Sequence, residues 1–175
     1  MLVTMKRKDF KSLEDISLIW ACIEPTIQQV RGRNFAVKSE VYATLNRGQR
    51  ALLLFQMLYG HTATGVDEFY THMFYLLSNE GVWSQLRKGM QYFGAYDMEQ
   101  LIEQMEMVFQ SRHSGELDKS AEQQKVLFTE DDITAEMSST SSLLNKTFRD
   151  LLPMTIKLVA TYIRDNESEY VELID

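Results

Sequence analysis

The side chains that could do chemistry are few, and they do not gather into a complete set. His72 follows Glu68 by four residues, so a helix would place both side chains on one face, where they could bind a metal ion. A metal site in a helical bundle needs three or four ligands, and the carboxylate-bridged kind repeats a Glu followed three residues later by His. The sequence does not repeat that pattern. We therefore interpret Glu68 and His72 as a hydrogen-bonded or surface pair, and we expect no metal and no other cofactor.

The other reactive groups also lack partners at informative spacings. His61 lies in a short polar link and His113 in a polar loop, so both are interpreted as surface residues. Cys22 follows an apolar stripe and is expected to be a small buried hydrophobe rather than a nucleophile. The sequence contains no phosphate-binding glycine loop and no nucleophile elbow. These observations predict a protein without catalysis.

Composition bounds the architecture. The chain has 175 residues, only 2 prolines and 8 glycines, which favours one all-α domain over residues 1–175 with about seven to eight helices. Residues 1–11 are interpreted as a loosely ordered lead-in, and residues 111–120 as a loop. The single cysteine fits a reducing compartment. The sequence shows neither an apolar run of about 20 residues nor a signal-peptide pattern, so we expect a cytoplasmic protein that does not enter a membrane.

The stretch Gly65 to Phe109 shows the clearest helical periodicity. Apolar residues recur at offsets of three and four in three segments, which begin at Val66, after Gly81 and after Gly94. The almost wholly apolar segment 50–59 predicts a buried helix that faces these three.

The flanking elements are predicted from capping residues and prolines. Ser12 is expected to cap a helix that ends or kinks at Pro25, unless Pro25 opens a new short helix over 26–30. Ser39 is expected to cap a short helix, and Thr129 a later one. Pro153 is expected to begin the last long helix. Both tryptophans, Trp20 and Trp83, are expected in the core.

Acidic side chains are the strongest candidates for binding. The net charge is −7, and the first fifty residues are basic on balance while the rest is acidic. One helix would align Glu99, Glu103 and Glu106 in a column, because these residues are four and three positions apart. This column is either a solvated outer face or an anionic surface for a basic partner. A second acidic group could add to it: Glu130, Asp131, Asp132 and Glu136. Direct binding of nucleic acid is not expected, because it needs clustered Lys and Arg.

One family resemblance concerns residues 47–110. The run Gly65-Val66-Asp67-Glu68-Phe69-Tyr70 resembles a glycine–hydrophobe–Asp–Gln–aromatic–aromatic motif of a family of small acidic bacterial DNA-mimic proteins. The later run that closes on Gly94-Ala95 is similar to that family's second signature. The chain departs from the motif at Glu68, where the family has Gln, and at Ala63-Thr64, where it has Asn-Gly. The resemblance implies an all-helical fold whose surface carboxylates imitate DNA phosphates.

Three functional hypotheses follow. The first is a non-catalytic regulator that binds a basic, DNA-binding protein through an acidic face as a DNA mimic. The second is an immunity- or chaperone-like binder, because the abundant methionines either fill the core or line an adaptable apolar groove. The third is a metal-dependent helical-bundle enzyme that uses Glu68 and His72. A homodimer is left open in each case.

Overall fold

The computed structural model describes residues 2–76, 81–113 and 135–175, and within these ranges the chain is all-α. Eight α-helices and one short parallel two-stranded sheet are present in this part of the chain. The prediction of an all-α fold with seven to eight helices is therefore confirmed. In chain order the elements are β1 (Val3–Lys6), α1 (Arg7–Ser12), α2 (Asp15–Val30), α3 (Phe35–Thr44), α4 (Arg47–Thr62), α5 (Val66–Leu76), α6 (Val82–Tyr92), α7 (Tyr96–His113), α8 (Ala135–Asp165), the 3₁₀ turn η3 (Glu167–Glu169) and β2 (Val171–Ile174).

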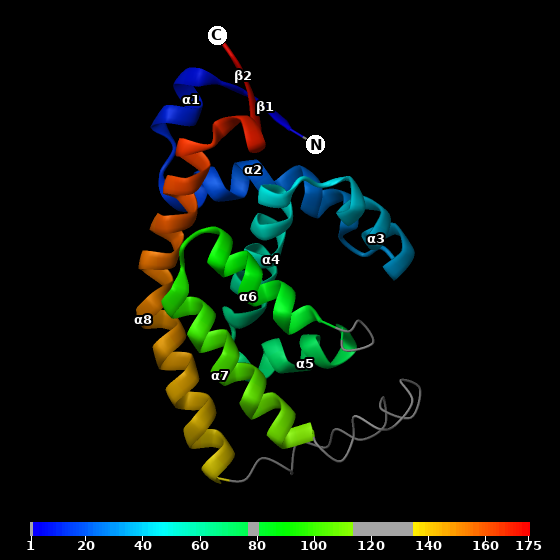
Figure 1. Ribbon diagram of the computed structural model, residues 1–175, viewed down its shortest axis with the longest axis vertical. Coiled ribbons are helices and arrows are strands. Elements are labelled where there is room, and N and C mark those ends of the chain that lie inside the picture. Colours follow the sequence, from blue (N-terminus) through cyan, green and yellow to red (C-terminus); the bar gives the residue numbers. More distant parts are fainter. Residues whose placement is uncertain (1, 77–80, 114–134) are drawn as a thin grey trace.

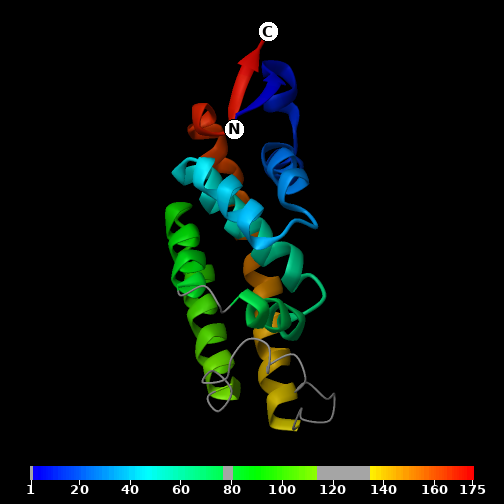
Figure 2. The same ribbon diagram turned by 90° about the vertical axis from the view of Figure 1, so that its right-hand side faces the viewer.

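The longest helix, α8, runs along one side of the molecule, as Figure 1 shows. Helix α7 packs against α8, α6 packs against α7, and α4 lies between α2, α5 and α6. The two strands pair at one end of the molecule, beside both chain termini, as Figures 1 and 2 both show.

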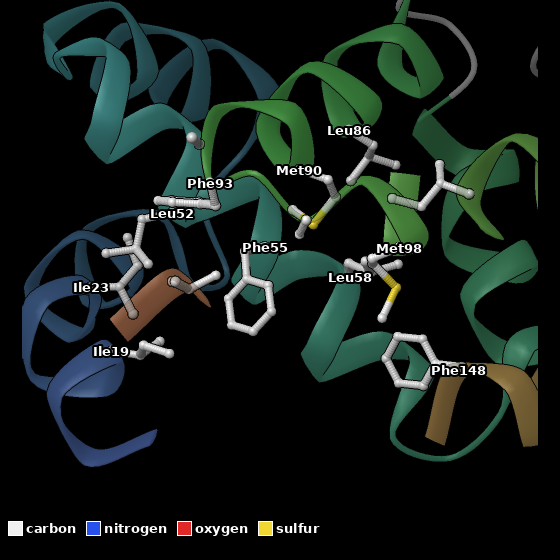
Figure 3. Close-up of a cluster of buried hydrophobic side chains, with 14 of the residues drawn as sticks. Ile19, Ile23, Leu52, Phe55, Leu58, Leu86, Met90, Phe93, Met98 and Phe148 are labelled. Atoms are coloured by element: carbon white, nitrogen blue, oxygen red, sulfur yellow. The ribbon is translucent and has the colours of Figure 1, made fainter. Parts of the chain in front are cut away.

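Helix α4 supplies the middle of the core, as its apolar sequence predicts. Its Leu52, Phe55 and Leu58 are almost completely buried, and Figure 3 shows them among side chains of α2 and α6. Complete burial of each such side chain contributes about 1.5–3 kcal/mol to stability. The remaining labelled residues of this cluster are Ile19, Ile23, Leu86, Met90, Phe93, Met98 and Phe148.

Neither proline interrupts its helix. Pro25 lies inside α2 and Pro153 inside α8, so the helix end predicted at Pro25, the new helix predicted after it and the helix start predicted at Pro153 are wrong. A proline within a helix costs about 3 kcal/mol. Buried side chains lie on both sides of each proline, and keeping both halves packed in one continuous helix offsets that cost. In α8 they include Phe148 before Pro153 and Val159 after it.

Two predicted caps are also wrong. Helix α3 begins at Phe35, because the side chain of Asn34 accepts a hydrogen bond from the backbone N–H of Val37. Ser39 therefore lies within α3. Ser12 is the last residue of α1 and does not cap α2, which follows Glu14. The cap predicted at Thr129 lies outside the described residues.

The chain ends differ most from prediction. Residues 1–11, expected to be a loosely ordered lead-in, contain β1 and all but the last residue of α1. Strand β1 pairs with β2 in parallel, with Val3 beside Val171, and local sequence patterns carry no signal for a contact between residues so far apart. Helix α7 extends through His113, so the loop predicted over 111–120 begins no earlier than 114, and the remainder lies outside the described residues.

Only one of the two tryptophans is in the core. Trp83 is 5% exposed, as predicted, whereas Trp20 is 43% exposed on α2. The neighbours Leu18 and Ile19 are among the residues by which that helix faces the core. The prediction for Trp20 is therefore wrong, because a tryptophan on the outer side of an amphipathic helix resembles a core residue in sequence alone.

The segment around Glu169 fastens the C-terminal end of the chain to the start of α4. Asn46 caps α4 through the backbone N–H of Gln49 and donates its own Nδ2 to the carbonyl of Glu169 at 2.7 Å. The hydroxyl of Tyr92 donates to the Glu169 carboxylate at 2.6 Å. Gly48 lies directly against Glu169 and Tyr170, and no space is left there for a Cβ atom.

Replacing Gly48 with Ala should therefore destabilise the protein. The added methyl group would overlap the side chains of Glu169 and Tyr170, and such overpacking typically costs about 1–3 kcal/mol. Urea unfolding would measure the loss. Gly60→Ala in the same helix is the matched control, because its Cβ would meet only the end of Gln56 and Ala favours a helix. Equal stability of the Gly48→Ala and Gly60→Ala variants would contradict the account.

Candidate functional site

The motif that carries the family resemblance joins three helices. Arg112 of α7 donates hydrogen bonds to Asp67 of α5 at 2.9 Å and to Ser141 of α8 at 2.8 Å. The hydroxyl of Ser141 also donates to Asp67, at 2.7 Å. The Arg112 side chain is 14% exposed and lies over the ring of Tyr70. Asp67 thus links α5 to α7 and α8 through hydrogen bonds.

Two further motif features position the start of α5. Gly65 has a φ of +142°, a backbone conformation that residues with a Cβ atom rarely adopt. The next backbone N–H, that of Val66, donates to the side-chain oxygen of Asn145 in α8 at 2.7 Å. Asn145 therefore satisfies one of the N–H groups that the first turn of a helix leaves unpaired. Gly94 also has a positive φ, +71°, in the turn between α6 and α7.

The aromatic residues of the motif belong to the core. Phe69 and Tyr70 are 1% and 4% exposed, and their rings contact those of Trp83 and Phe109. Burial raises the pKa of Tyr70 above its ordinary value, and this effect exceeds the lowering by the nearby Arg112. The phenol stays protonated at physiological pH and offers no reactive oxygen. The motif residues thus act together as packing and capping groups.

The acidic column is only partly available for binding. Glu106 forms an ion pair with Arg87 of α6, and Glu99 accepts a hydrogen bond from Gln91 of the same helix. Glu103 is exposed on α7 and has no ion-pair partner among the described residues. The column therefore faces α6 along one edge of α7. Of the second acidic group, Glu130, Asp131 and Asp132 lie outside the described residues, as does the side chain of Glu136.

Sequence reasoning missed an exposed apolar surface on the outer side of α7 and α8. Tyr96 and Met107 of α7 are 61% and 58% exposed, and Leu143 and Met154 of α8 are 64% and 58% exposed. Each pair is eleven residues apart, which is about three helical turns, so each pair lies in line along its own helix. The helices are packed side by side, as both ribbon views show (Figures 1 and 2).

A surface cavity of about 120 Å³ lies between the two helices of this surface. Tyr96 and Met154 both line it, so the apolar rows of α7 and α8 meet there. Leu151 and Leu158 supply part of its wall. Asp97 and Thr155 also line it, so its wall is partly polar. We call the surface formed by Tyr96, Met107, Leu143 and Met154 the α7–α8 face.

The histidines form a contact that the sequence spacing does not show. The rings of His61 and His72 lie with their centroids 3.8 Å apart, and His72 Nε2 is 3.8 Å from a carboxylate oxygen of Glu68. The predicted Glu68–His72 contact is thus present, and His61 joins it. Among the described residues no group of three His, Cys, Asp or Glu side chains is arranged to hold a metal ion.

Cys22 is buried, as predicted, and carries no disulfide. Burial raises the pKa of its thiol to about 12, which keeps it protonated and unreactive. Among the described helices, none combines the length and apolar character needed to cross a membrane. The chain matches no protein-family model, no curated protein and no solved structure.

The cap on α5 gives a direct test of this junction. Asn145→Ala removes the acceptor for the Val66 N–H, and loss of a helix cap costs about 0.5–2 kcal/mol. Asn145→Asp keeps an acceptor oxygen and places a negative charge at the helix start, where the helix dipole favours it. In urea unfolding, the Ala variant should lose stability and the Asp variant should keep most of it. Two equally destabilised variants would show that the contact does not act as a cap.

The histidine contact predicts a dependence of stability on pH. In the folded protein, burial lowers the pKa of His61, with contributions from the neighbouring His72 and Lys38 against an opposing effect of Glu68. The unfolded chain therefore binds a proton at His61 more readily than the folded one. Stability from this group is complete above the ordinary histidine pKa of about 6.5 and decreases as the pH falls below it.

His61→Gln should reduce this pH dependence. Urea midpoints measured at about pH 7.5 and about pH 5.5, on either side of the ordinary histidine pKa, should differ more for the wild type than for the variant. The same difference in both proteins would show that His61 is not the titrating group.

Proposed function

We propose that this protein is a non-catalytic protein-interaction module and that the α7–α8 face is its binding surface. One observation carries the proposal: four large apolar side chains, each more than half exposed, form one row on α7 and one on α8, and one member of each row lines the cavity between these helices. Contiguous exposed apolar patches are uncommon on proteins that act alone, and they often mark interaction sites. The apolar centre would supply the anchoring contacts.

The charged side chains beside this centre suit a polar rim. Glu99 and Glu103 lie beyond the apolar row of α7, on its α6 side. Interfaces commonly have an apolar core that a polar, solvent-accessible rim surrounds. The carboxylates of α7 favour a partner with basic side chains at that edge, which retains the predicted preference for a basic partner.

The DNA-mimic version of this function has less support than the apolar face. Imitating duplex DNA requires a dense array of carboxylates, because the duplex carries one negative charge per about 1.7 Å of its axis. In the described part of the chain, Glu99 and Glu103 lie on one edge of α7, Asp97 lies at the cavity beside α8, and Arg87 neutralises Glu106. We therefore place the DNA-mimic hypothesis second.

Two exposed methionines support the hypothesis of an immunity- or chaperone-like binder. Met107 and Met154 are exposed on the α7–α8 face, whereas Met73, Met90 and Met105 fill the core. Methionine adapts to irregular partner surfaces because its side chain is unbranched and polarisable. We propose a cytoplasmic setting, since the free Cys22 thiol suits a reducing compartment.

Affinity capture from the native cell extract tests the proposal. The full chain would be immobilised as the wild type and as the Leu143→Glu variant, which places a charge in the apolar centre of the α7–α8 face. Leu143 is 64% exposed, so the substitution should leave the fold intact. We expect the wild type to retain one or more proteins that the variant loses, because a desolvated charge at the centre of an interface is costly.

Ser142→Glu is the matched control. Ser142 is exposed on the same helix, but adjacent residues point about 100° apart, so this carboxylate lies off the face. The control should retain the same proteins as the wild type. Identical retention by the Leu143→Glu variant would contradict the proposal, as would equal loss by both variants. Repeating the capture at high salt distinguishes binding through the apolar face from binding as a DNA mimic. Charge-dependent binding weakens at high salt, whereas apolar binding persists.

A further inference from the structure

The α7–α8 face carries opposite charges on its two edges. On the α7 side, Glu99 and Glu103 border the apolar row. On the α8 side, Lys146 and Lys157 are exposed and lie eleven residues apart, in line with each other along the helix. Asp150, in a 3.9 Å contact with Lys146, leaves this edge with one net positive charge. Asp97 lines the cavity between the two helices, so the order across the face is an acidic edge, a centre that is apolar apart from Asp97, and a basic edge.

From this order we infer that the α7–α8 face binds a second copy of the same chain. The inference rests on the proposed function, because it names the partner of the same surface. A symmetric dimer uses one patch on both subunits, so the patch must complement itself. An acidic edge and a basic edge on either side of an apolar centre meet that condition, since a half-turn exchanges the two edges.

The charges also select the orientation. A two-fold axis parallel to the helices lays α7 of each copy over α8 of the other, and the acidic edge of one then meets the basic edge of the other. A two-fold axis across the helices instead lays α7 over α7. It would bring Glu103 near its own counterpart, and like charges opposite each other disfavour association. The first arrangement is the one that the surface supports.

The same arrangement gives each of the four apolar side chains of the α7–α8 face a partner. Helices α7 and α8 run in opposite directions, and Arg112 at one end contacts Ser141, while Tyr96 at the other end lies beside Met154. In the dimer, Tyr96 of one copy lies over Met154 and the cavity of the other. Met107 likewise lies near Leu143. All four exposed apolar side chains are thus covered at once.

The available area fits a weak or transient dimer. Helix α7 has 18 residues and is therefore about 27 Å long. Two packed helices, about 10 Å apart, present a width of about 20 Å. The area buried on both copies is then on the order of 1,000 Å², near the lower limit of specific interfaces. We expect an association that depends on protein concentration.

Analytical ultracentrifugation of the full chain tests the inference. Between about 1 μM and about 200 μM, a range that suits an interface of this size, the mass should rise from 20.4 kDa toward twice that value. Leu143→Glu should weaken association about tenfold or more, because few central residues carry most of the binding energy. Ser17→Glu, at an exposed position of α2, should associate like the wild type.

A charge exchange makes the test specific for this orientation. Glu103→Lys alone and Lys146→Glu alone should each weaken the dimer, because one edge then carries the wrong sign. The double variant should recover part of the lost affinity, since each copy again presents one acidic and one basic edge to the other. A double variant weaker than both single variants would overturn the proposed arrangement.

The outcome also separates this inference from the proposed function. A chain that stays monomeric throughout the concentration range overturns the inference. If the same face then captures a different protein that Leu143→Glu loses, the proposed function stands and its partner is not a second copy. A dimer that Leu143→Glu leaves unchanged overturns the inference as well, because that dimer uses another surface.

Discussion

The relative placement of α5, α7 and α8 depends on one nearly buried guanidinium. Arg112 connects Asp67 to Ser141, and a charge in that position is stable only when its donors are paired. The contact fixes the end of α7 against α8, and the cavity at Tyr96 and Met154 marks the other end. Because α7 contacts α8 at both of its ends, the rows of exposed apolar side chains on the two helices are held side by side. The surface that we propose for binding is therefore a consequence of how the interior is tied together.

Much of the fold could be predicted from the sequence, because it follows from local patterns. The helix starts at Val66 and Val82, and the burial of the α4 side chains, follow from apolar periodicity and glycine stops. The errors at Pro25 and at the chain ends concern packing and pairing between distant residues. Pro25 remains inside a helix because side chains before and after it are buried, and the pairing of β1 with β2 joins the two chain ends. Neither effect leaves a signal within a short window of sequence.

The candidate site was harder to predict for a related reason. The column of glutamates was visible from spacing alone, but its pairing with Arg87 depends on a neighbouring helix. Asp67 in the family-like motif is accounted for by its contacts with α7 and α8, which no helical pattern encodes. The apolar side chains of Tyr96 and Met154 resemble core residues in sequence, and only packing reveals that they point outward. The exposure of these side chains depends on how the helices pack together, so it could not be predicted from the sequence.

Cross-linking of isotope-mixed protein tests the central claim most directly. Unlabelled and ¹⁵N-labelled chains would be mixed and treated with a reagent that joins carboxylates to lysines without a spacer. We predict cross-links of mixed isotope composition between the carboxylates of α7, chiefly Glu103, and the lysines of α8, chiefly Lys146 and Lys157. Cross-links that are found only within single chains, or that join chains through other helices, would contradict self-association through the α7–α8 face.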